Sequence, residues 1–160
     1  MSFFEWSDEM SVGVPLIDSD HRALIGFIND LHVGLESGDE LAALGETLGK
    51  LVAYIEFHFK REEKVMQACG FPHIETHQRE HRDFTKRIQD IHVRYHREAD
   101  VAMTRDLLDF LKDWLNHHIL IQDKAYARYT GMNPALANEV AAAFGPGLAN
   151  GACHSVTGTV

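Results

Sequence analysis

Apolar residues recur every three or four positions along most of this chain, and turn-forming residues interrupt them at intervals. The interruptions fall at residues 12–15, 36–39, 69–72, 96–100 and 131–134; glycine or proline occurs in four of them, and the stretch 96–100 is polar. Between them, the spacing has the period of an amphipathic helix and not the alternation of a strand. The pattern therefore predicts four long helices and no strand.

Each predicted helix carries one apolar stripe. In chain order, the stripe positions are Ile17, Leu24, Ile28, Leu31 and Leu35, then Leu44, Leu48, Leu51 and Ile55, then Phe84, Ile88, Ile91 and Tyr95, and last Leu107, Leu111 and Trp114. Short connections make consecutive helices antiparallel. We therefore predict an all-α protein, an up-down-up-down antiparallel four-helix bundle with an N-terminal arm, over residues 1–131. Residues 132–160 are predicted to form a C-terminal extension, with a short helix near 135–144 and a disordered tail from Gly145.

Five histidines and a glutamate occupy positions on these apolar stripes, at the same spacing of three or four residues. They are His21 in the first helix, His58 and Glu62 in the second, His77 and His81 in the third, and His118 in the fourth. A polar group in a bundle core costs several kcal/mol unless it is paired or bound to a metal. Counted from the turns at about 1.5 Å per residue, these positions agree in depth to within roughly one helical turn. The stripes therefore predict one metal site that all four helices share.

The stretch "WLNHHILIQD" at 114–123 offers two adjacent histidines and an aspartate. His118 continues the stripe of Leu111 and Trp114, whereas His117 is rotated about 100° from it. On a regular α-helix, Asp123 would lie about 140° from His118. A π-bulge brings residues i and i+5 onto one face and is frequent at functional sites. We therefore predict a π-bulge between His118 and Asp123, which would add Asp123 to the ligands.

Composition limits the chemistry. The net charge of −9 argues against a nucleic-acid partner, because phosphate recognition needs a basic face. The two cysteines, Cys69 and Cys153, provide neither a disulfide framework nor a cysteine zinc site. Five imidazoles and two carboxylates exceed the needs of one ion and suit two, with iron, zinc, copper and manganese left open.

The sequence also bears on where in the cell the protein is located. No stretch approaches the roughly 18 apolar residues of a membrane span. Acidic residues stand near the N-terminus, where a signal peptide would carry lysine or arginine. We therefore expect a cytoplasmic protein without a membrane span.

Four segments resemble the hemerythrins, in particular the bacterial single-domain form. They are "VGVPLIDSDH", "HFKREE", "HIETHQREH" and "WLNHHILIQDKAY", and the resemblance covers roughly residues 4–130. The spacings H-x-x-x-E, H-x-x-x-H and H-x-x-x-x-D occur in the order of that family, and the last one also selects His118 over His117.

The resemblance implies a pair of non-haem irons that bind O2 reversibly. One iron would be held by His77, His81 and His118, and the other by His21 and His58. Glu62 and Asp123 would bridge the irons, together with a solvent-derived oxo or hydroxo group. O2 would then bind end-on, as hydroperoxide, at the five-coordinate iron that has two histidines.

Apolar residues within a turn of the ligands are candidates for the lining of the O2 site. They are Leu24, Ile55, Phe59, Trp114 and Ile121. The remaining histidines are interpreted as structural or surface residues: His32, His73, His92, His96, His117 and His154. Asp18 is interpreted as a helix-start residue that accepts from free backbone N–H groups.

Three classes of function stay open. An O2 carrier, store or delivery protein that is not an enzyme is favoured, because an imidazole-rich ligand set gives little drive for O–O cleavage. A di-iron peroxidase, oxidase or nitric-oxide-handling enzyme would need substrate access or a proton donor, which the sequence does not identify. A module that senses O2, redox state or iron would have to use the C-terminal extension. A protein partner that receives O2 also stays open.

Overall fold

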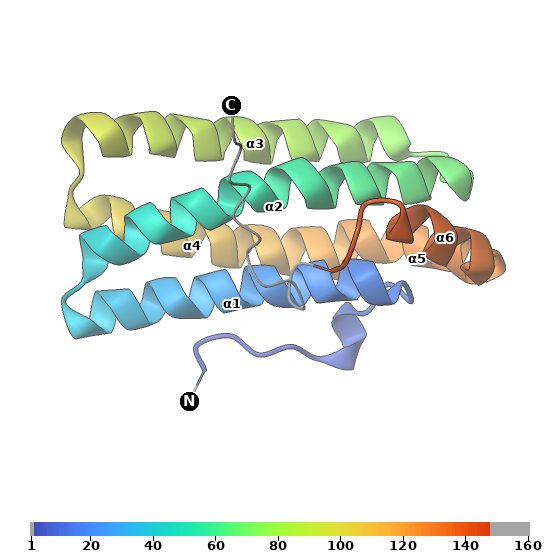
Figure 1. Cartoon of the computed structure of the whole chain (residues 1–160), viewed down its shortest axis with the longest axis horizontal. Helices are drawn as coiled ribbons and strands as arrows, with labels where there is room; N and C mark the ends of the chain where they lie inside the picture. The colour runs from blue at the N-terminus through green and yellow to red at the C-terminus, as the bar shows by residue number, and fades with distance from the viewer. Residues whose placement is uncertain (1, 148–160) are drawn as a thin grey trace, which may run out of the picture.

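Four helical segments run side by side in the computed structural model, which describes residues 2–147 (Figure 1). Consecutive segments are antiparallel, and the described part of the chain contains no strand. The predicted all-α four-helix bundle is therefore confirmed. The elements are η1 (Asp8–Met10), α1 (Pro15–Ser37), α2 (Glu40–Ala68), α3 (Ile74–Glu98), α4 (Val101–His117), the π-helical η2 (His118–Asp123), α5 (Lys124–Met132) and α6 (Pro134–Ala142).

Local sequence sets where the helices begin and end. Pro15 occupies the first turn of α1, where its missing N–H costs nothing. Gly38 ends that helix in the left-handed region, at φ 85°, which glycine adopts without strain. The Asp100 side chain accepts from the Met103 N–H at 2.9 Å and so caps the start of α4. The predicted turns are thus observed where the sequence indicated them.

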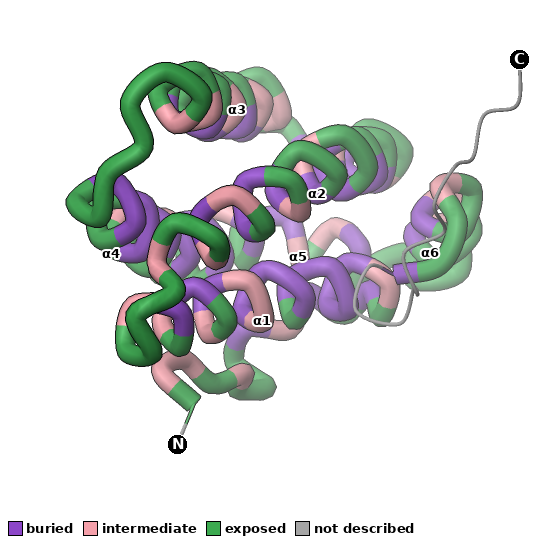
Figure 2. Tube along the Cα trace, turned by 60° about the vertical axis from the view of Figure 1, so that its left-hand side comes forward, coloured by how far each residue is buried: buried purple, intermediate pink, exposed green. Residues whose placement is uncertain are grey.

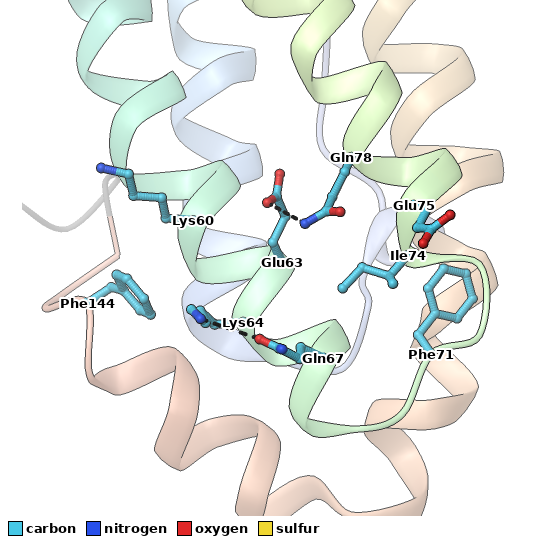
Figure 3. A pocket seen from close by; sticks show the side chains of 9 residues that line it. All are labelled: Lys60, Glu63, Lys64, Gln67, Phe71, Ile74, Glu75, Gln78 and Phe144. Atoms are coloured by element: carbon cyan, nitrogen blue, oxygen red, sulfur yellow. Dashed lines mark hydrogen bonds between the residues drawn. The ribbon is translucent and has the colours of Figure 1, made fainter.

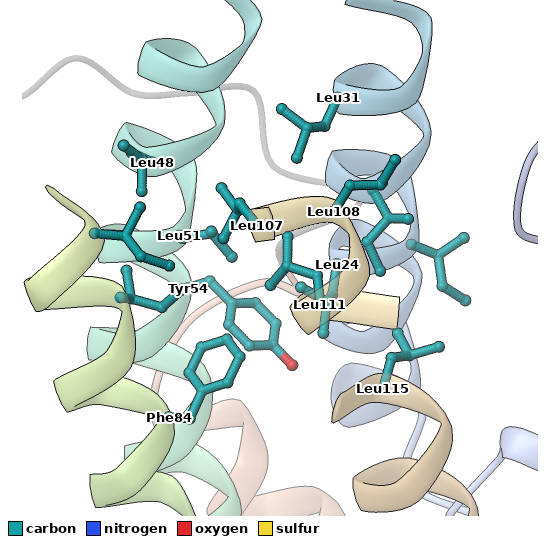
Figure 4. Packing of buried hydrophobic residues seen from close by; sticks show 14 of the residues in the cluster. Leu24, Leu31, Leu48, Leu51, Tyr54, Phe84, Leu107, Leu108, Leu111 and Leu115 are labelled. Carbon is teal, nitrogen blue, oxygen red and sulfur yellow. The ribbon is translucent and has the colours of Figure 1, made fainter. Parts of the chain in front are cut away.

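Two apolar clusters fill the bundle, one on each side of a polar layer. The larger includes most of the buried apolar residues near the α1–α2 and α3–α4 turns, and Figure 4 shows the packing of members such as Leu51, Phe84 and Leu111. The smaller lies toward the α2–α3 turn and includes Ile17, Val65 and Tyr126. Along each of the four segments, the predicted ligands fall between members of the two clusters. The site therefore crosses the bundle as one layer.

The extension after the bundle folds back onto it. Helix α6 packs against α2 and α1, and its inward residues Ala137 and Ala141 are buried (Figure 2). The predicted short helix near 135–144 is confirmed by α6. The disordered tail predicted from Gly145 was wrong for residues 145–147, whose backbone accepts hydrogen bonds from Arg61 and packs on Ser19. The rest of the predicted tail, 148–160, lies outside the described residues. The division of the chain after residue 131 stays a prediction.

Asp18 fastens the N-terminal arm to α1. Its Oδ1 accepts from the backbone N–H of Val12 at 2.9 Å, and its Oδ2 accepts from the Ser11 hydroxyl at 2.6 Å. Asp18 thus accepts from a backbone N–H as expected, but that N–H belongs to the arm and not to the first turn of the helix.

None of the helices in residues 2–147 combines the length and apolar character that crossing a membrane requires.

Candidate metal centre

All seven predicted ligands are buried, and the structure brings them together. None of their side chains is more than 2% exposed. Potential ligand atoms of Glu62, His77, His81 and His118 lie within 4.8 Å of one another, and so do those of His21, His58 and Glu62. The layer thus holds a three-histidine group and a two-histidine group, which share Glu62. His117 is exposed, as the stripe predicted.

The π-helical turn places Asp123 between the two groups. Its Oδ1 lies 3.1 Å from His118 Nε2 and 3.2 Å from His77 Nε2, and its Oδ2 lies 3.2 Å from His21 Nε2. Because η2 spans His118–Asp123, the fifth residue after His118 returns to the same face. The predicted π-bulge is confirmed. Each oxygen of one carboxylate therefore faces a different histidine group.

Many of the inward atoms are left without a hydrogen bond. Among the described residues, these include Nε2 of His21, His58 and His77, Oε2 of Glu62 and both oxygens of Asp123. The Nε2 atoms of His81 and His118 lie only 3.3 Å apart. Buried polar atoms are normally satisfied, and inward lone pairs at such distances repel unless a proton or a cation lies between them. Imidazole and carboxylate groups are ligands of iron, zinc and manganese, so the residues present fit metal ions in both groups.

Three further carboxylates orient three of the predicted ligand histidines from outside the layer. Nδ1 of His58 lies 3.1 Å from Asp20, that of His81 lies 2.8 Å from Glu63, and that of His118 lies 2.9 Å from Glu80. A carboxylate only accepts, so each ring donates its Nδ1–H and keeps the Nε2 lone pair directed inward. Sequence reasoning missed all three.

The missed carboxylates share a pattern. Each stands directly beside a ligand in the sequence and bonds a histidine on the next helix: Asp20 beside His21, Glu63 beside Glu62, and Glu80 beside His81. Adjacency to a ligand was therefore the available signal. Which histidine each one reaches depends on how the helices pack.

Aromatic rings cover the faces of three ligand histidines. Phe59 stacks on His81 with centroids 3.8 Å apart, and Trp114 stacks on His118 at 4.2 Å. Tyr54, which the sequence did not single out, stacks on His58 at 4.6 Å. These rings exclude water from one face of each imidazole.

The predicted lining residues fare unequally. Leu24 is fully buried, and Ile55 is packed against the same cluster. Ile121 is 57% exposed, so the expectation that it lines the site was wrong. The prediction for Ile121 assumes that the regular α-helical period continues past His118. In the π-helical turn the residue that returns to the face of His118 is Asp123, so Ile121 lies away from that face. Buried Ile119 is the isoleucine that packs into the apolar core beside His118.

In the metal-free protein, the carboxylates of this layer favour the protonated form of two of its histidines. Burial alone would lower the pKa of His77, but the nearby carboxylates of Asp123 and Glu62 raise it to about 10. For His118, burial again lowers the pKa, but Asp123 and Glu80 together raise it to about 9. Burial lowers the pKa of His58. Metal ions would displace the protons on His77 and His118, because a metal ligand must be deprotonated.

Glu63 connects this layer to the surface. Its other oxygen, Oε2, accepts from the side chain of Gln78 at 3.0 Å. Both residues line a hollow of about 460 Å³ between α2 and α3, with Phe144 of the C-terminal segment across from them (Figure 3). The Glu63 side chain is 28% exposed, so water reaches the outer end of the hydrogen bond to His81.

The hemerythrin HHE cation-binding domain matches residues 12–129. This chain belongs to the hemerythrin family. It is 35% identical over 127 residues to a bacteriohemerythrin of Stenotrophomonas maltophilia, covering 79% of this chain and 81% of that one. A myohemerythrin of Theromyzon tessulatum is 27% identical over 123 residues, covering 77% and 90% of the two chains.

A solved hemerythrin structure has the same fold. The crystal structure of a hemerythrin mutant with a leucine-to-alanine substitution aligns with a TM-score of 0.69 and 28% identity. The alignment covers 81% of this chain and 98% of that hemerythrin. Helix α6 lies beyond residue 129, where the family match ends.

Proposed function

We propose that this hemerythrin-family chain is a non-haem di-iron protein that binds O2 reversibly, as a carrier, store or delivery protein. One observation carries the proposal: unpaired ring nitrogens and carboxylate oxygens from all four helical segments face one another inside an apolar bundle. The names of the relatives, bacteriohemerythrin and myohemerythrin, support iron as the metal.

The two histidine groups would hold one iron each. His77, His81 and His118 would hold the first iron, and His21 and His58 the second. Glu62 and Asp123 would bridge them, which is supported by the two Asp123 oxygens facing different groups. The iron pair, when bound, supplies the electrons that reversible O2 binding requires. The second group has one histidine fewer, so its ion is the one with room for a small ligand.

The chain itself orients the ligands and keeps water out. Asp20, Glu63 and Glu80 hold three imidazoles with Nε2 inward. The hydroxyl of Tyr126 donates to Oε1 of Glu62 and fixes that carboxylate. Leu24, Ile55, Phe59 and Trp114 provide apolar walls. Small apolar ligands enter such a site at little cost, whereas a free charged product is costly to form in a low-dielectric interior.

Binding without turnover is the better-supported reading of this site. The phenols nearest the ligands are Tyr54 and Tyr126, and burial raises the pKa of both well above 10. They therefore retain their protons at neutral pH and are poor acids for cleaving an O–O bond. A cytoplasmic location and a protein partner that receives O2 remain predictions.

Visible spectroscopy of the iron-loaded chain tests the proposal. The protein is reduced without oxygen, exposed to O2 and returned to argon. A charge-transfer band that appears with O2 and disappears under argon is the expected result. A spectrum that changes once and does not return under argon would overturn reversible binding and favour an enzyme or a sensor.

The adjacent histidines 117 and 118 provide a matched pair of variants. His118→Ala removes a buried ring of the three-histidine group and should abolish the reversible band. His117→Ala removes an exposed ring from the same turn and should leave it unchanged. Equal effects of both substitutions would contradict the ligand assignment.

A further inference from the structure

Arg61 is a buried arginine that the metal site itself does not use. It lies on α2 between His58 and Glu62, and its side chain is 1% exposed. A buried guanidinium is stable only when nearly all of its donors are satisfied and its charge is matched. Its partners therefore show what holds this part of the molecule together.

Those partners come from two distant parts of the chain. One terminal nitrogen donates to Oδ2 of Asp20 on α1. The other donors reach main-chain carbonyls at and just after the end of α6, at 2.9–3.2 Å: those of Ala141, Phe144, Gly145 and Pro146. Carbonyls at the C-terminal end of a helix favour a cation. The guanidinium thus ties the C-terminal segment, residues 141–147, to α1.

A second contact seats the same segment on α1. Gly147 is buried, and a Cβ added there would lie 2.3 Å from Oγ of Ser19 and 2.4 Å from its Cβ. Ser19 directly precedes Asp20, so the segment passes over the carboxylate that Arg61 holds. Only glycine allows this approach, and a larger residue would lift the segment from the helix.

The bond to Asp20 leads on to the metal layer. The oxygen that accepts from Arg61, Oδ2, is also the oxygen 3.1 Å from Nδ1 of His58. A displacement of the guanidinium therefore acts on the same atom that fixes the His58 ring. His58 belongs to the two-histidine group, and its Nε2 points inward.

We propose that Arg61 is a positioning residue for His58, and that the C-terminal segment sets the position of Arg61. The segment holds the guanidinium by its carbonyls, the guanidinium holds Asp20, and Asp20 holds the ring with Nε2 toward the two-histidine ion. The part of this inference that concerns the ion rests on the proposed function. The part that concerns the ring does not.

The ring orientation is tested in the metal-free full-length chain by ¹⁵N NMR of the histidine rings. Wild type should show His58 as a single Nδ1–H tautomer. Gly147→Val, which lifts the segment, and Arg61→Met should each shift the His58 signals toward a mixture of tautomers. Gly49→Val is the control, because Gly49 is exposed on α2 and a Cβ added there would meet no other part of the protein within 4 Å. If Arg61→Met does not fold, Arg61→Lys replaces it, since lysine lacks the fork that spans both sets of partners.

Metal release provides the second readout. Iron-loaded wild type and Gly147→Val are mixed with an excess of chelator, and the loss of iron is followed with time. Loss of an outer hydrogen bond to a metal ligand typically lowers metal affinity by about 10-fold or more. We expect this loss to appear as a roughly 10-fold faster release of the more labile iron in the variant. Gly49→Val should match wild type.

The outcomes separate this inference from the proposed function. A His58 tautomer unchanged in both Gly147→Val and Arg61→Met overturns the positioning role, whether or not the protein binds O2. A changed tautomer in a protein that fails to bind O2 reversibly supports the positioning role and overturns the proposed function. Altered ring signals with an unchanged rate of iron release would overturn the part that concerns the ion.

Discussion

The two sides of the metal layer use the same hydrogen bond in opposite surroundings. On the two-histidine side, the carboxylate that holds His58 is Asp20, which is fully buried against Arg61 and sealed under the C-terminal segment. On the three-histidine side, Glu63 and Glu80 hold His81 and His118 from the bundle surface, where they are 28% and 27% exposed. The outer carboxylate of the two-histidine side is buried and paired with an arginine, whereas the outer carboxylates of the three-histidine side are in contact with solvent.

This difference shows how environment changes the value of one interaction. A carboxylate at the surface can be replaced by water at small cost. A carboxylate buried against an arginine cannot, because its loss leaves a charge without a partner in a low-dielectric interior. The proposed ligand-binding side therefore depends on distant parts of the chain, and the other side depends mainly on its own helices.

The largest expected contrast is in stability. Asp20→Ala should lower the free energy of unfolding by about 3–5 kcal/mol, because it leaves Arg61 buried without a carboxylate. Glu80→Ala should cost less than about 1 kcal/mol, since water can reach His118 Nδ1. Urea unfolding of the metal-free proteins measures both. Similar losses for the two variants would break the comparison.

Metal affinity should respond on the exposed side even where stability does not. Glu63→Gln should weaken metal binding by about 10-fold, because the Nδ1–H of His81 then meets a neutral amide in place of the carboxylate that orients its ring and raises its basicity. Glu75→Gln is the matched control: Glu75 lines the same hollow and is exposed. Competition with a chelator of known affinity gives the ratio. An equal effect of the two substitutions would remove the role assigned to Glu63.

In the metal-free chain, His58 should respond to pH oppositely to His77 and His118, and also oppositely to His21, whose pKa is raised, against the effect of burial, by the nearby carboxylate of Asp123. The raised pKa values of His77 and His118, about 10 and about 9, add stability that is complete below about pH 6.5 and is lost as pH rises through 9 to 10. The lowered pKa of His58 makes its contribution present above about pH 6.5 and lost as pH falls.

Thermal unfolding checks this dependence on pH. The midpoint temperature of the metal-free chain should fall between about pH 6.5 and 10, by roughly 2–4 °C for each kcal/mol lost. Metal ions replace the protons concerned, so the metal-loaded chain should show a weaker fall. A midpoint that rises over that range would contradict the assignment of protons to His77 and His118.

The last contrast is kinetic and needs no substitution. The ring N–H of His58 should exchange with water roughly 10-fold or more slowly than that of His118, because exchange on the sealed side requires local opening. Ring ¹⁵N–¹H spectra of the unsubstituted metal-free chain compare the two directly. Faster exchange at His58 would show that the C-terminal segment does not seal it.

The fold and most of the seven inward groups were predictable because both depend on the helical spacing of residues in the sequence. Polar residues such as His58 and Glu62 occupy stripe positions that are otherwise apolar, so they can be recognised from the sequence alone. The π-helical turn followed from the five-residue spacing between His118 and Asp123. Ile121 was misplaced because the regular period was carried through the same turn.

The outer partners could not be predicted in the same way. Asp20, Glu63 and Glu80 reach histidines 38, 18 and 38 residues away, so their targets depend on the rotation of each helix against its neighbour. The partners of Arg61 are mainly backbone carbonyls more than 80 residues later. Every residue has a carbonyl, so no side-chain pattern marks the ones that are used.

The π-helical turn restricts how the length of the fourth segment can vary. Leu120 and Ile121 point outward, at 37% and 57% exposed, and their identities can change freely. Because the π-helical turn carries one residue more than an α-helical turn, deletion of one residue would leave the aspartate four positions after His118, on the same face of a regular helix. Deletion of two residues, or insertion of one, would rotate all that follows by about 100°, so that Asp123 would leave His118 and Tyr126 would leave Glu62. In this stretch, homologous chains should therefore differ by substitutions or by a gap of one residue, and not by longer gaps.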